Sequence, residues 1–485
     1  MLKYIYSVGI GALLLVQISL AQNSTSFDVN GQNDKKKNCT DPGIHDFPDD
    51  LFTERQREQG AVLFHFFMAF YCFTLLAFVC NDYFLPAVDH ICTDLKISQD
   101  VAGATFMAMA TSVPELSVNV ISTFITENDL GMGTVVGSAV FNTLGVAACS
   151  GLAATQVIKL SWWPLTRDSS IYIVVLCTLI VVVWDEEVRW YEATVLILLY
   201  LIYFILMFAN TQLHKGAKKV VKTFSTSKQD LQDVKSVSCH LEVPLEGTYR
   251  PHAGSVIRAK LSATEVESTV EKPKSYFSTL SSSKGGTLMK IWWLFKLPIV
   301  LVLFITVPDC RHRAVRRLYP LTFLMCVVWI GIAAYIISWM ITVIGDTFEI
   351  PDSVMGMTLS AIGGCLPETI ASVILVRQGE GSMGISNSIG ASTLDILMCL
   401  GLPWLIKTLM HNEPVKIISS GMSYNCLALL GLIIVFYLVV LLFRFHLSRR
   451  LGVTCLVLYA IYIVFAVLEE MNTFFFVNPP ICGWE

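Results

Sequence analysis

The chain has 485 residues, of which 54% are hydrophobic and 15% are charged. A soluble fold of this length does not bury so large an apolar share, so the composition excludes a soluble globular protein and indicates a polytopic membrane protein embedded in a lipid bilayer. The formal net charge is −4 and no concentrated basic domain occurs, which gives no support to nucleic-acid binding.

The first 21 residues have the pattern of a secretory signal peptide. Lys3 precedes an apolar stretch, and the small residues Ser19 and Ala21 come before a polar segment. An uncleaved first helix is the alternative, although the apolar stretch is shorter than the ~20 residues that a bilayer span needs. The tail at 22–60, which the signal would export, carries two N-glycosylation sequons, at Asn23 and Asn38.

Ten apolar runs follow, each close to the length of a membrane span. Five lie in a first half, 61–210, and five in a second half, 318–473. We therefore predict an all-α polytopic membrane protein of about ten transmembrane helices. The runs are 61–80, 98–125, 132–157, 170–184, 192–209, 318–345, 353–376, 384–406, 419–443 and 452–470.

A polar segment, 211–317, separates the halves and begins with a lysine-rich stretch directly after a span. The positive-inside rule places this segment in the cytosol. It has no apolar periodicity, and both a disordered tether and a phosphorylated regulatory loop fit it. Within it, 291–308 is apolar but is interrupted by Lys296 and Pro298 and followed by a basic cluster, so we predict an interfacial or re-entrant segment there.

Counting spans from an exported N-terminus places the C-terminal tail, 474–485, on the same outer side. Cys39 and Cys482 then lie in the two outer tails, and a disulfide between them is one hypothesis. Separate thiols, free or paired between chains, fit equally well. Most of the other cysteines fall within apolar helices, where cysteine acts as a small hydrophobic residue.

A repeat links the two halves. Glu115 and Asn142 are 27 residues apart, as are Glu368 and Asp395, and each Glu follows a Pro inside an apolar run. The count of spans makes the two copies run in opposite directions. Inverted repeats with Pro- or Gly-interrupted helices at matching positions are typical of secondary transporters, whose ion site lies between the repeats near the membrane midplane.

The residue types of the repeat favour a site for hard cations. A Pro within a span leaves backbone carbonyls unpaired, and these are tolerated where they face an ion or water. Carboxylates, hydroxyls and amides are oxygen ligands suited to calcium, sodium or potassium. Structural roles are the alternative: the acids could form ion pairs with Lys or Arg, and the hydroxyl and amide groups could hydrogen-bond between helices to pack them. The candidate cation-binding residues are Thr111, Ser112, Glu115, Ser138, Asn142, Glu368 and Asp395.

The two copies resemble the signature repeats of the potassium-dependent sodium/calcium exchangers, in the cation/calcium exchanger superfamily. The resemblance lies in "GATFMAMATSVPEL" with "GTVVGSAVFN", and in "MGMTLSAIGGCLPETIASV" with "LDILMCLGLPW". It implies a ten-helix antiporter that works by alternating access, with no enzyme activity and no cofactor. By position, Glu115 and Glu368 match the calcium and sodium carboxylates, and Asp395 matches the acid associated with potassium dependence.

The second repeat departs from the family pattern. Gly364 and Cys365 stand where the family usually has two hydroxyl residues, and Glu368 stands where it has Asp. Ala391 and Ser392 replace a Ser and an Asn. A thiol is a poor ligand for hard cations, so these departures put affinity, stoichiometry and potassium coupling in question.

Three further functions compete with the exchanger reading. They are a related cation exchanger with altered selectivity or proton coupling, a non-transporting regulatory homologue, and an intramembrane hydrolase. The hydrolase is disfavoured because "VIGDT" lacks the Gly-x-Gly-Asp form and no Ser/His pair or zinc motif lies within the spans. We expect the plasma membrane as the location, with an organelle membrane as the alternative, and a homodimer is one assembly that the sequence allows.

Overall fold

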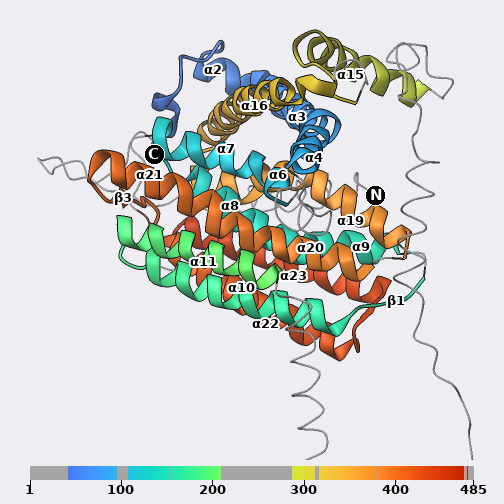
Figure 1. Cartoon of the computed structure of the whole chain (residues 1–485). Helices are drawn as coiled ribbons and strands as arrows, with labels where there is room; N and C mark the ends of the chain where they lie inside the picture. Colours follow the sequence, from blue (N-terminus) through green and yellow to red (C-terminus); the bar gives the residue numbers. More distant parts are fainter. Residues whose placement is uncertain are drawn as a thin grey trace, which may run out of the picture. The chain divides into compact units, whose positions relative to one another are not determined.

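The structure is a computed structural model that describes residues 42–95, 108–154, 156–208, 287–311, 316–379, 381–473 and 478 (Figure 1). The predicted signal peptide, both sequons, Cys39, Cys482 and most of the polar segment lie outside the described residues. The chain divides into two compact units, one made of Met1–Ile205 with Phe323–Glu485 and the other of Leu206–Thr322.

The first half of the larger unit is a series of helices, several of them joined through π-helical turns; these turns and the 3-10 turns η1 and η7 are labelled η. The elements are η1 (Gly43–Asp46), α2 (Glu54–Gln56), η2 (Arg57–Ala61), α3 (Val62–Phe78), η3 (Val79–Phe84), α4 (Leu85–Asp94), α6 (Ala108–Thr111), α7 (Val113–Ile121), η5 (Ser122–Thr126), α8 (Leu130–Val140), η6 (Phe141–Gly145), α9 (Val146–Ala153), β1 (Ile158–Lys159), α10 (Trp162–Val183), β2 (Glu187–Val188) and α11 (Trp190–Phe208).

The second half repeats this order. Its elements are α16 (Tyr319–Thr347), α17 (Asp352–Met355), η8 (Gly356–Ser360), α18 (Ala361–Gly364), α19 (Leu366–Arg377), α20 (Gly381–Leu394), η9 (Asp395–Leu400), α21 (Gly401–His411), β3 (Val415–Lys416), α22 (Gly421–Leu442), β4 (His446–Leu447) and α23 (Arg449–Glu470).

The described residues contain eight helices that are long and apolar enough to cross a membrane, or nine if the bent pair Asp352–Gly364 and Leu366–Arg377 is one span. The predicted run 98–125 begins at residues outside the described ranges, so the count of ten stays a prediction. The first helix differs from its prediction at its end: after a kink at Gly60 (φ 115°), α3 begins at Val62, close to the predicted 61, and continues through η3 and α4 to Asp94 rather than ending near 80. It continues past polar Asn81 and Asp82 through η3, where a hydropathy run has to stop.

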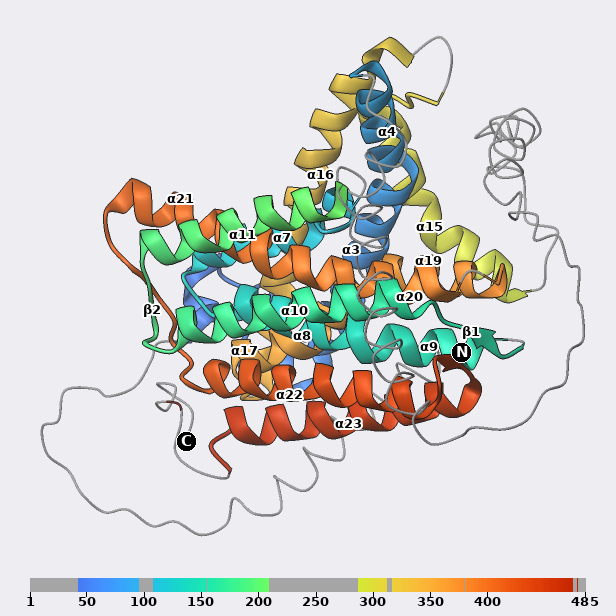
Figure 2. The ribbon, with the colours of Figure 1, turned by 60° about the horizontal axis from the view of Figure 1, so that its bottom comes forward.

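Two short β-ribbons relate the halves to each other. β1 pairs with β4 through Ile158 and Leu447, and β2 pairs with β3 through Val188 and Val415, both antiparallel. β1 and β2 lie at opposite ends of α10, which is about 33 Å long at 1.5 Å per residue (Figure 2). Since α22 leads from β3 to β4, it runs antiparallel to α10. Exchanging the halves therefore exchanges the ribbons, as inverted repeats require.

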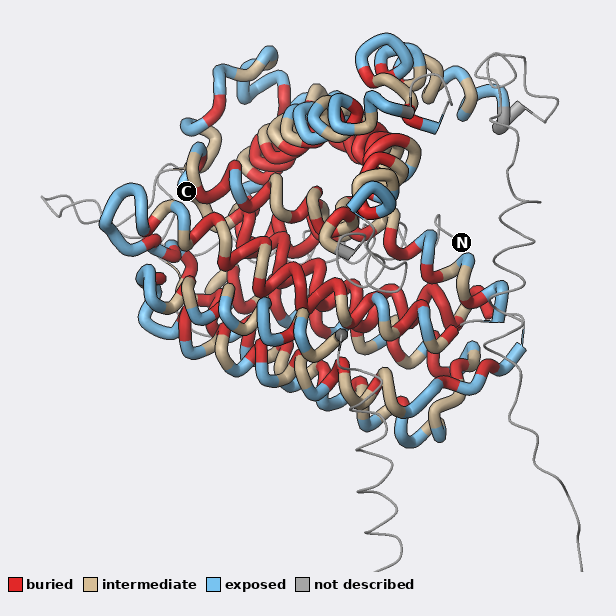
Figure 3. The backbone as a smooth tube through the Cα atoms, viewed as in Figure 1, coloured by how far each residue is buried: buried red, intermediate tan, exposed pale blue. Residues whose placement is uncertain are grey.

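The interior of this unit is built on α8 and the helices that contact it. In the most apolar stretch of Leu130–Ala153, 94% of the residues are buried, against 17% in Trp190–Met207 (Figure 3). α8 contacts α7, α20 and η8, and glycines allow the backbones to approach closely. A Cβ on Gly137 would collide with the backbone of Met357, and one on Gly356 with the carbonyl of Leu130. These close approaches hold the elements that carry the candidate site.

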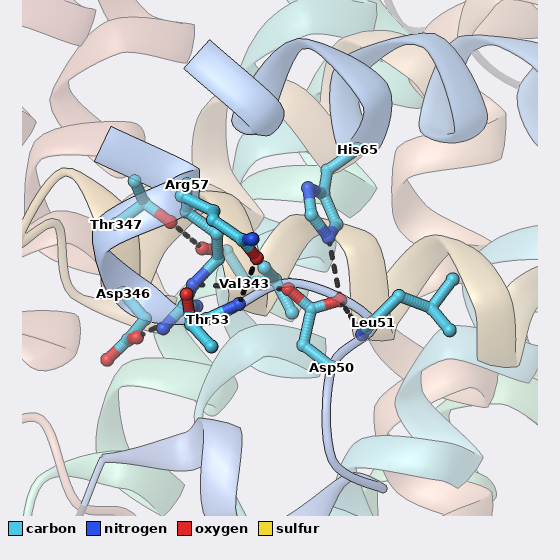
Figure 4. Close-up of polar contacts among 9 residues, drawn as sticks. Asp50, Leu51, Thr53, Arg57, His65, Val343, Asp346 and Thr347 are labelled. Carbon is cyan, nitrogen blue, oxygen red and sulfur yellow. Dashed lines mark hydrogen bonds and ion pairs between the residues drawn. The ribbon is translucent and has the colours of Figure 1, made fainter. Parts of the chain in front are cut away.

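Buried polar contacts join the segment before α3 both to α3 and to α16, the first long helix of each half (Figure 4). A hydrogen bond of 3.0 Å joins the Asp50 carboxylate to Nε2 of His65, and Nη1 of Arg57 lies 3.1 Å from Oδ2 of Asp346. Arg57 is 6% exposed and His65 is fully buried. Breaking such a buried pair leaves an uncompensated charge, so these contacts fix the two helices against each other.

The smaller unit contains α15 (Thr287–Thr306) and the short 3-10 turn η7 (Arg316–Leu318). α15 is one continuous helix that includes Pro298. The predicted segment 291–308 is thus helical to Thr306, and its interfacial or re-entrant position remains a prediction.

Candidate cation site

The two Pro-Glu segments form matching broken helices. α6 gives way to α7 at Ser112 (φ −89°, ψ 3°), and α18 gives way to α19 at Cys365 (φ −79°, ψ 0°), where the second helix bends by 46°. Pro114 and Pro367 lie in the first turn after each break, where a missing N–H costs least. Each Glu therefore lies in the first turn of a helix, whose dipole favours a negative charge there.

Three buried carboxylates lie within electrostatic range of one another inside the protein. Glu115 is 3% exposed, Glu368 is 6% exposed and Asp395 is 1% exposed. Glu115 interacts electrostatically with both of the others, and so does Glu368 with Asp395. One oxygen of each, Oε2 in both Glu and Oδ2 in Asp395, has no hydrogen-bond partner. Buried carboxylates with free oxygens are costly unless they share a cation or protons.

The first repeat supplies neutral oxygen groups to the acids of the second. The side chains of Thr111 and Asn142 lie against Glu368, and the Ser112 hydroxyl lies against Asp395. The Oδ1 and Nδ2 atoms of Asn142 and the Oγ atom of Ser112 are buried and have no hydrogen-bond partner. These groups are therefore available to a ligand. Ser138 differs, because its hydroxyl donates to the carbonyl of Val135 in its own helix at 2.9 Å.

The second repeat has no equivalent neutral groups. Gly364 occupies the place of Thr111, and a Cβ there would lie 3.0 Å from Oε1 of Glu115. Cys365 occupies the place of Ser112, and its thiol lies 3.9 Å from the carbonyl of Ser138. Glu115 therefore faces a glycine where Glu368 faces a hydroxyl.

The geometry favours a cation held by mixed oxygen ligands. In the described ranges, no three His, Cys, Asp or Glu side chains lie close enough to enclose one metal ion. A cation at the three carboxylates would need hydroxyl, amide and backbone oxygens as well, as alkali and alkaline-earth ions commonly do.

Three buried residues next to the predicted set were missed by the sequence analysis. Asn119 is 2% exposed and donates from Nδ2 to the carbonyl of Cys399, and Ser388 donates to the carbonyl of Asn142 at 2.6 Å. Asn119 lies one turn after Glu115 and Cys399 one turn after Asp395. This four-residue spacing is a signal that could have found them.

Comparison with known proteins identifies the family. The family model for the sodium/calcium exchanger protein matches residues 65–209 and 318–468, which are the two helical halves. The chain belongs to this exchanger family. Sodium/potassium/calcium exchanger 4 of Homo sapiens is 35% identical to this exchanger homologue over 92% of the chain and 88% of the relative, and exchanger 5 of Homo sapiens is 36% identical over 90% and 89%.

A solved structure of the sodium-calcium exchanger NCX_Mj is also similar to the chain. It covers 83% of this chain and 98% of its own, with 17% identity and a TM-score of 0.44. The family match and the apolar spans together make the chain an integral membrane protein of helical exchanger type.

Proposed function

We propose that the protein is a secondary active antiporter that exchanges sodium for calcium and potassium across the plasma membrane by alternating access. The observation that carries this proposal is the group of three buried carboxylates, each with an unpartnered oxygen. Two of them, Glu115 and Glu368, follow the matching helix breaks of the two halves, and Asp395 begins η9. The printed names of the relatives, which are sodium/potassium/calcium exchangers, support the same ions.

Charge explains how exchange would be coupled. A calcium ion and a potassium ion together carry three positive charges, which equals the charge of ionised Glu115, Glu368 and Asp395. Sodium ions that enter from the other side neutralise the same carboxylates. Sodium and the pair of calcium and potassium therefore cannot occupy the site at the same time. An empty site keeps its buried charges uncompensated, which makes its passage through a closed state costly. Only a loaded site changes sides, and this is the condition for antiport.

Each predicted ligand has a role in this scheme. Glu115 and Glu368 bind calcium or sodium, and Asp395 binds potassium. Thr111, Ser112, Ser138 and Asn142 contribute neutral oxygens, Ser138 through lone pairs that its bond to Val135 leaves free. Inorganic cations are thus the substrates, and no cofactor is needed.

A second candidate is an exchanger with altered selectivity or with proton coupling. Gly364 and Cys365 favour it, because they remove hydroxyl ligands from the side of the site that faces Glu115. Clustered carboxylates also take up protons readily, since a proton removes their mutual repulsion.

Flux in sealed vesicles tests the proposal. Vesicles loaded with sodium and diluted into sodium-free medium with calcium should accumulate calcium, and potassium should increase the rate. The Glu115→Gln and Glu368→Gln variants should accumulate none above empty vesicles. Absence of calcium uptake by the wild type under every gradient would exclude calcium antiport, and uptake driven by a proton gradient alone would select the second candidate.

A further inference from the structure

Two side-chain stripes lead from the carboxylates toward one end of the spans. On α7 and η5 the stripe is Glu115, Asn119, Thr123 and Glu127, and on η9 and α21 it is Asp395, Cys399, Pro403 and Lys407. Residues four apart are neighbours on an α-helix surface, so each stripe follows successive turns away from the carboxylates, through the π-helical segments η5 and η9. α7 and η9 are in contact. The stripes end beside β2 and β3, at the end of the spans that the topology prediction places outside.

Polar bonds join the stripes beyond the site. Asn119 donates to the carbonyl of Cys399, one turn away from the carboxylates. Two turns further out, Nζ of Lys407 donates to the carbonyl of Thr123 at 2.7 Å and to Oε1 of Glu127 at 2.8 Å. We call this set of bonds the outer ladder. It consists of Asn119, Thr123, Glu127, Cys399 and Lys407.

The bonds of the outer ladder are partly shielded from water. Asn119 is 2% exposed, and the Lys407 side chain is 17% exposed although that of Glu127 is 70% exposed. A cation at the last carbonyls of a helix is also favoured by the helix dipole, and Thr123 lies in the last turn of η5. Separating the α7–η5 segment from the η9–α21 segment would break these bonds and leave the carbonyl of Cys399 without its donor.

A cavity of about 430 Å³ lies along the outer ladder. Its lining includes Asn119, Thr123, Met132, Trp404 and Lys407, together with Lys416. It thus extends from the surface residues of α21 to Asn119, a single turn from Glu115. The outer ladder therefore lies beside a cavity that ends one helical turn from Glu115.

The other repeat has no such ladder. The positions that match Asn119 and Thr123 are Ser372 and Val376 on α19, and those that match Cys399 and Lys407 are Val146 and Ala154 at α9. Ser372 donates to Gly384 in α20 instead, at 3.4 Å. At these described positions no hydrogen bond or ion pair crosses between α9 and α19. Polar bonds thus cross between the α7–η5 and η9–α21 segments, whereas the matching described positions of α9 and α19 are in contact without such bonds. The β1–β4 ribbon joins the two repeats elsewhere at that end.

We infer that the outer ladder biases the alternating-access equilibrium toward the state that is closed on the predicted outer side, with Asn119 and Lys407 as positioning residues. This inference rests on the proposed function for its meaning in transport. The physical reason is a difference between the two openings. Outward opening between the α7–η5 and η9–α21 segments breaks these bonds, and inward opening between α9 and α19 breaks no counterpart at the matching described positions. The populations of the two states shift according to the free energy of that difference.

Thiol labelling from the two sides tests the bias without relying on transport. Met132→Cys places a reporter in the outer cavity, and Ser150→Cys places one on α9. With Lys407→Gln added, we expect a membrane-impermeant reagent to label the outer reporter severalfold faster and the inner reporter more slowly. Lys407→Arg should keep the parental rates. Glu127→Gln, at an exposed side chain that leaves the bond to Thr123 in place, should shift both rates in the same directions by less.

Lys416→Gln is the matched control, because it removes the same charge from the lining of the same cavity without touching the outer ladder. It should leave both labelling rates within about twofold of the parent. Unchanged rates in Lys407→Gln, or equal acceleration by Lys416→Gln, would overturn the inference. Faster labelling on both sides would also overturn it, because that result means loosening of the fold rather than a shift between two states. Calcium flux does not enter any of these readouts, so their failure is separate from failure of the proposed function.

Discussion

The two broken helices hold the same carboxylate at the same place, yet only the first brings oxygen-bearing neighbours with it. Thr111 and Ser112 lie before Glu115 and reach across to Glu368 and Asp395, whereas Gly364 and Cys365 lie before Glu368 and offer Glu115 neither hydroxyl. Each repeat thus serves the acids of the other. Losing hydroxyls from the second repeat depletes the surroundings of the first repeat's acid.

This difference separates two requirements on the site. In the proposed site, the carboxylates would set the charge that cations must balance, and both repeats contribute carboxylates. The neutral groups set the size and the number of ligands, and one repeat has lost most of them. We therefore expect a site that binds cations but depends more on the first repeat for its neutral ligands. Substitutions at Thr111 and Ser112 should reduce cation affinity more than substitutions at Gly364 and Cys365.

The largest effect should come from removing either carboxylate. Glu115→Gln and Glu368→Gln keep the shape of the side chain and remove its charge, so a bound cation loses a charged ligand that no described neighbour replaces. We expect sodium-driven calcium uptake in vesicles to fall by more than about 100-fold in each variant. If one of the two variants keeps substantial uptake, the repeats do not share one site.

The next effect concerns potassium. Asp395→Asn leaves the side-chain volume unchanged but lowers the charge of the site from three to two carboxylates, which calcium alone then balances. We expect potassium to lose its stimulation of calcium uptake, with uptake in potassium-free medium retained. Uptake that still rises with potassium in Asp395→Asn would remove this residue from the potassium site.

A smaller effect should show the difference between the neutral groups of the two repeats directly. Ser112→Ala removes a hydroxyl that lies against Asp395, and Cys365→Ala removes only a thiol at the matching position. We expect the half-saturating calcium concentration to rise about tenfold in Ser112→Ala and by less than about twofold in Cys365→Ala. Equal effects in the two variants would show that the repeats contribute alike despite their different residues.

The smallest effect is on stability at an end of the spans. Asp129 lies just before α8, and burial raises its pKa from 3.8 to about 7, although the N–H groups of Ser419 and Ile418 partly oppose this. Between these two values the folded protein holds a proton that the unfolded chain has released, so this group makes the fold less stable as pH rises. Asp129→Asn should remove that trend.

The measurement for Asp129 is the unfolding temperature in detergent from about pH 5 to about pH 8. The variant should gain a few degrees on the wild type over this range. Other buried acids titrate in both proteins and cancel in the comparison. A constant difference between the two curves would mean that Asp129 ionises normally.

The sequence could indicate the carboxylates of the proposed site because they lie in short sequence patterns, and the structure places all three in the interior. Pro114 with Glu115 and Pro367 with Glu368 mark broken helices wherever they occur in apolar runs, and the equal spacing to Asn142 and Asp395 marks the repeat. The family match supports the exchanger type, while the ten-helix count, the sequons and the tail disulfide depend on residues outside the described ranges.

What the sequence could not predict is the contact between elements distant in the chain. Nothing in the sequence around Lys407, which lies near the end of an apolar run, indicates a partner for its side chain. Its bonds to Thr123 and Glu127 depend on how α21 packs on η5. The closeness of Gly364 to Glu115 is of the same kind. The length of the first helix was wrong for a different reason, because hydropathy cannot follow a helix through Asn81 and Asp82.

Equilibrium binding of radioactive calcium to the purified protein, with sodium as competitor, tests the shared site most directly. The wild type should bind calcium with sodium displacing it, and Glu115→Gln and Glu368→Gln should each abolish the binding, because one cation depends on carboxylates from both repeats. Calcium binding that survives in either variant, or that sodium does not displace, would contradict the account.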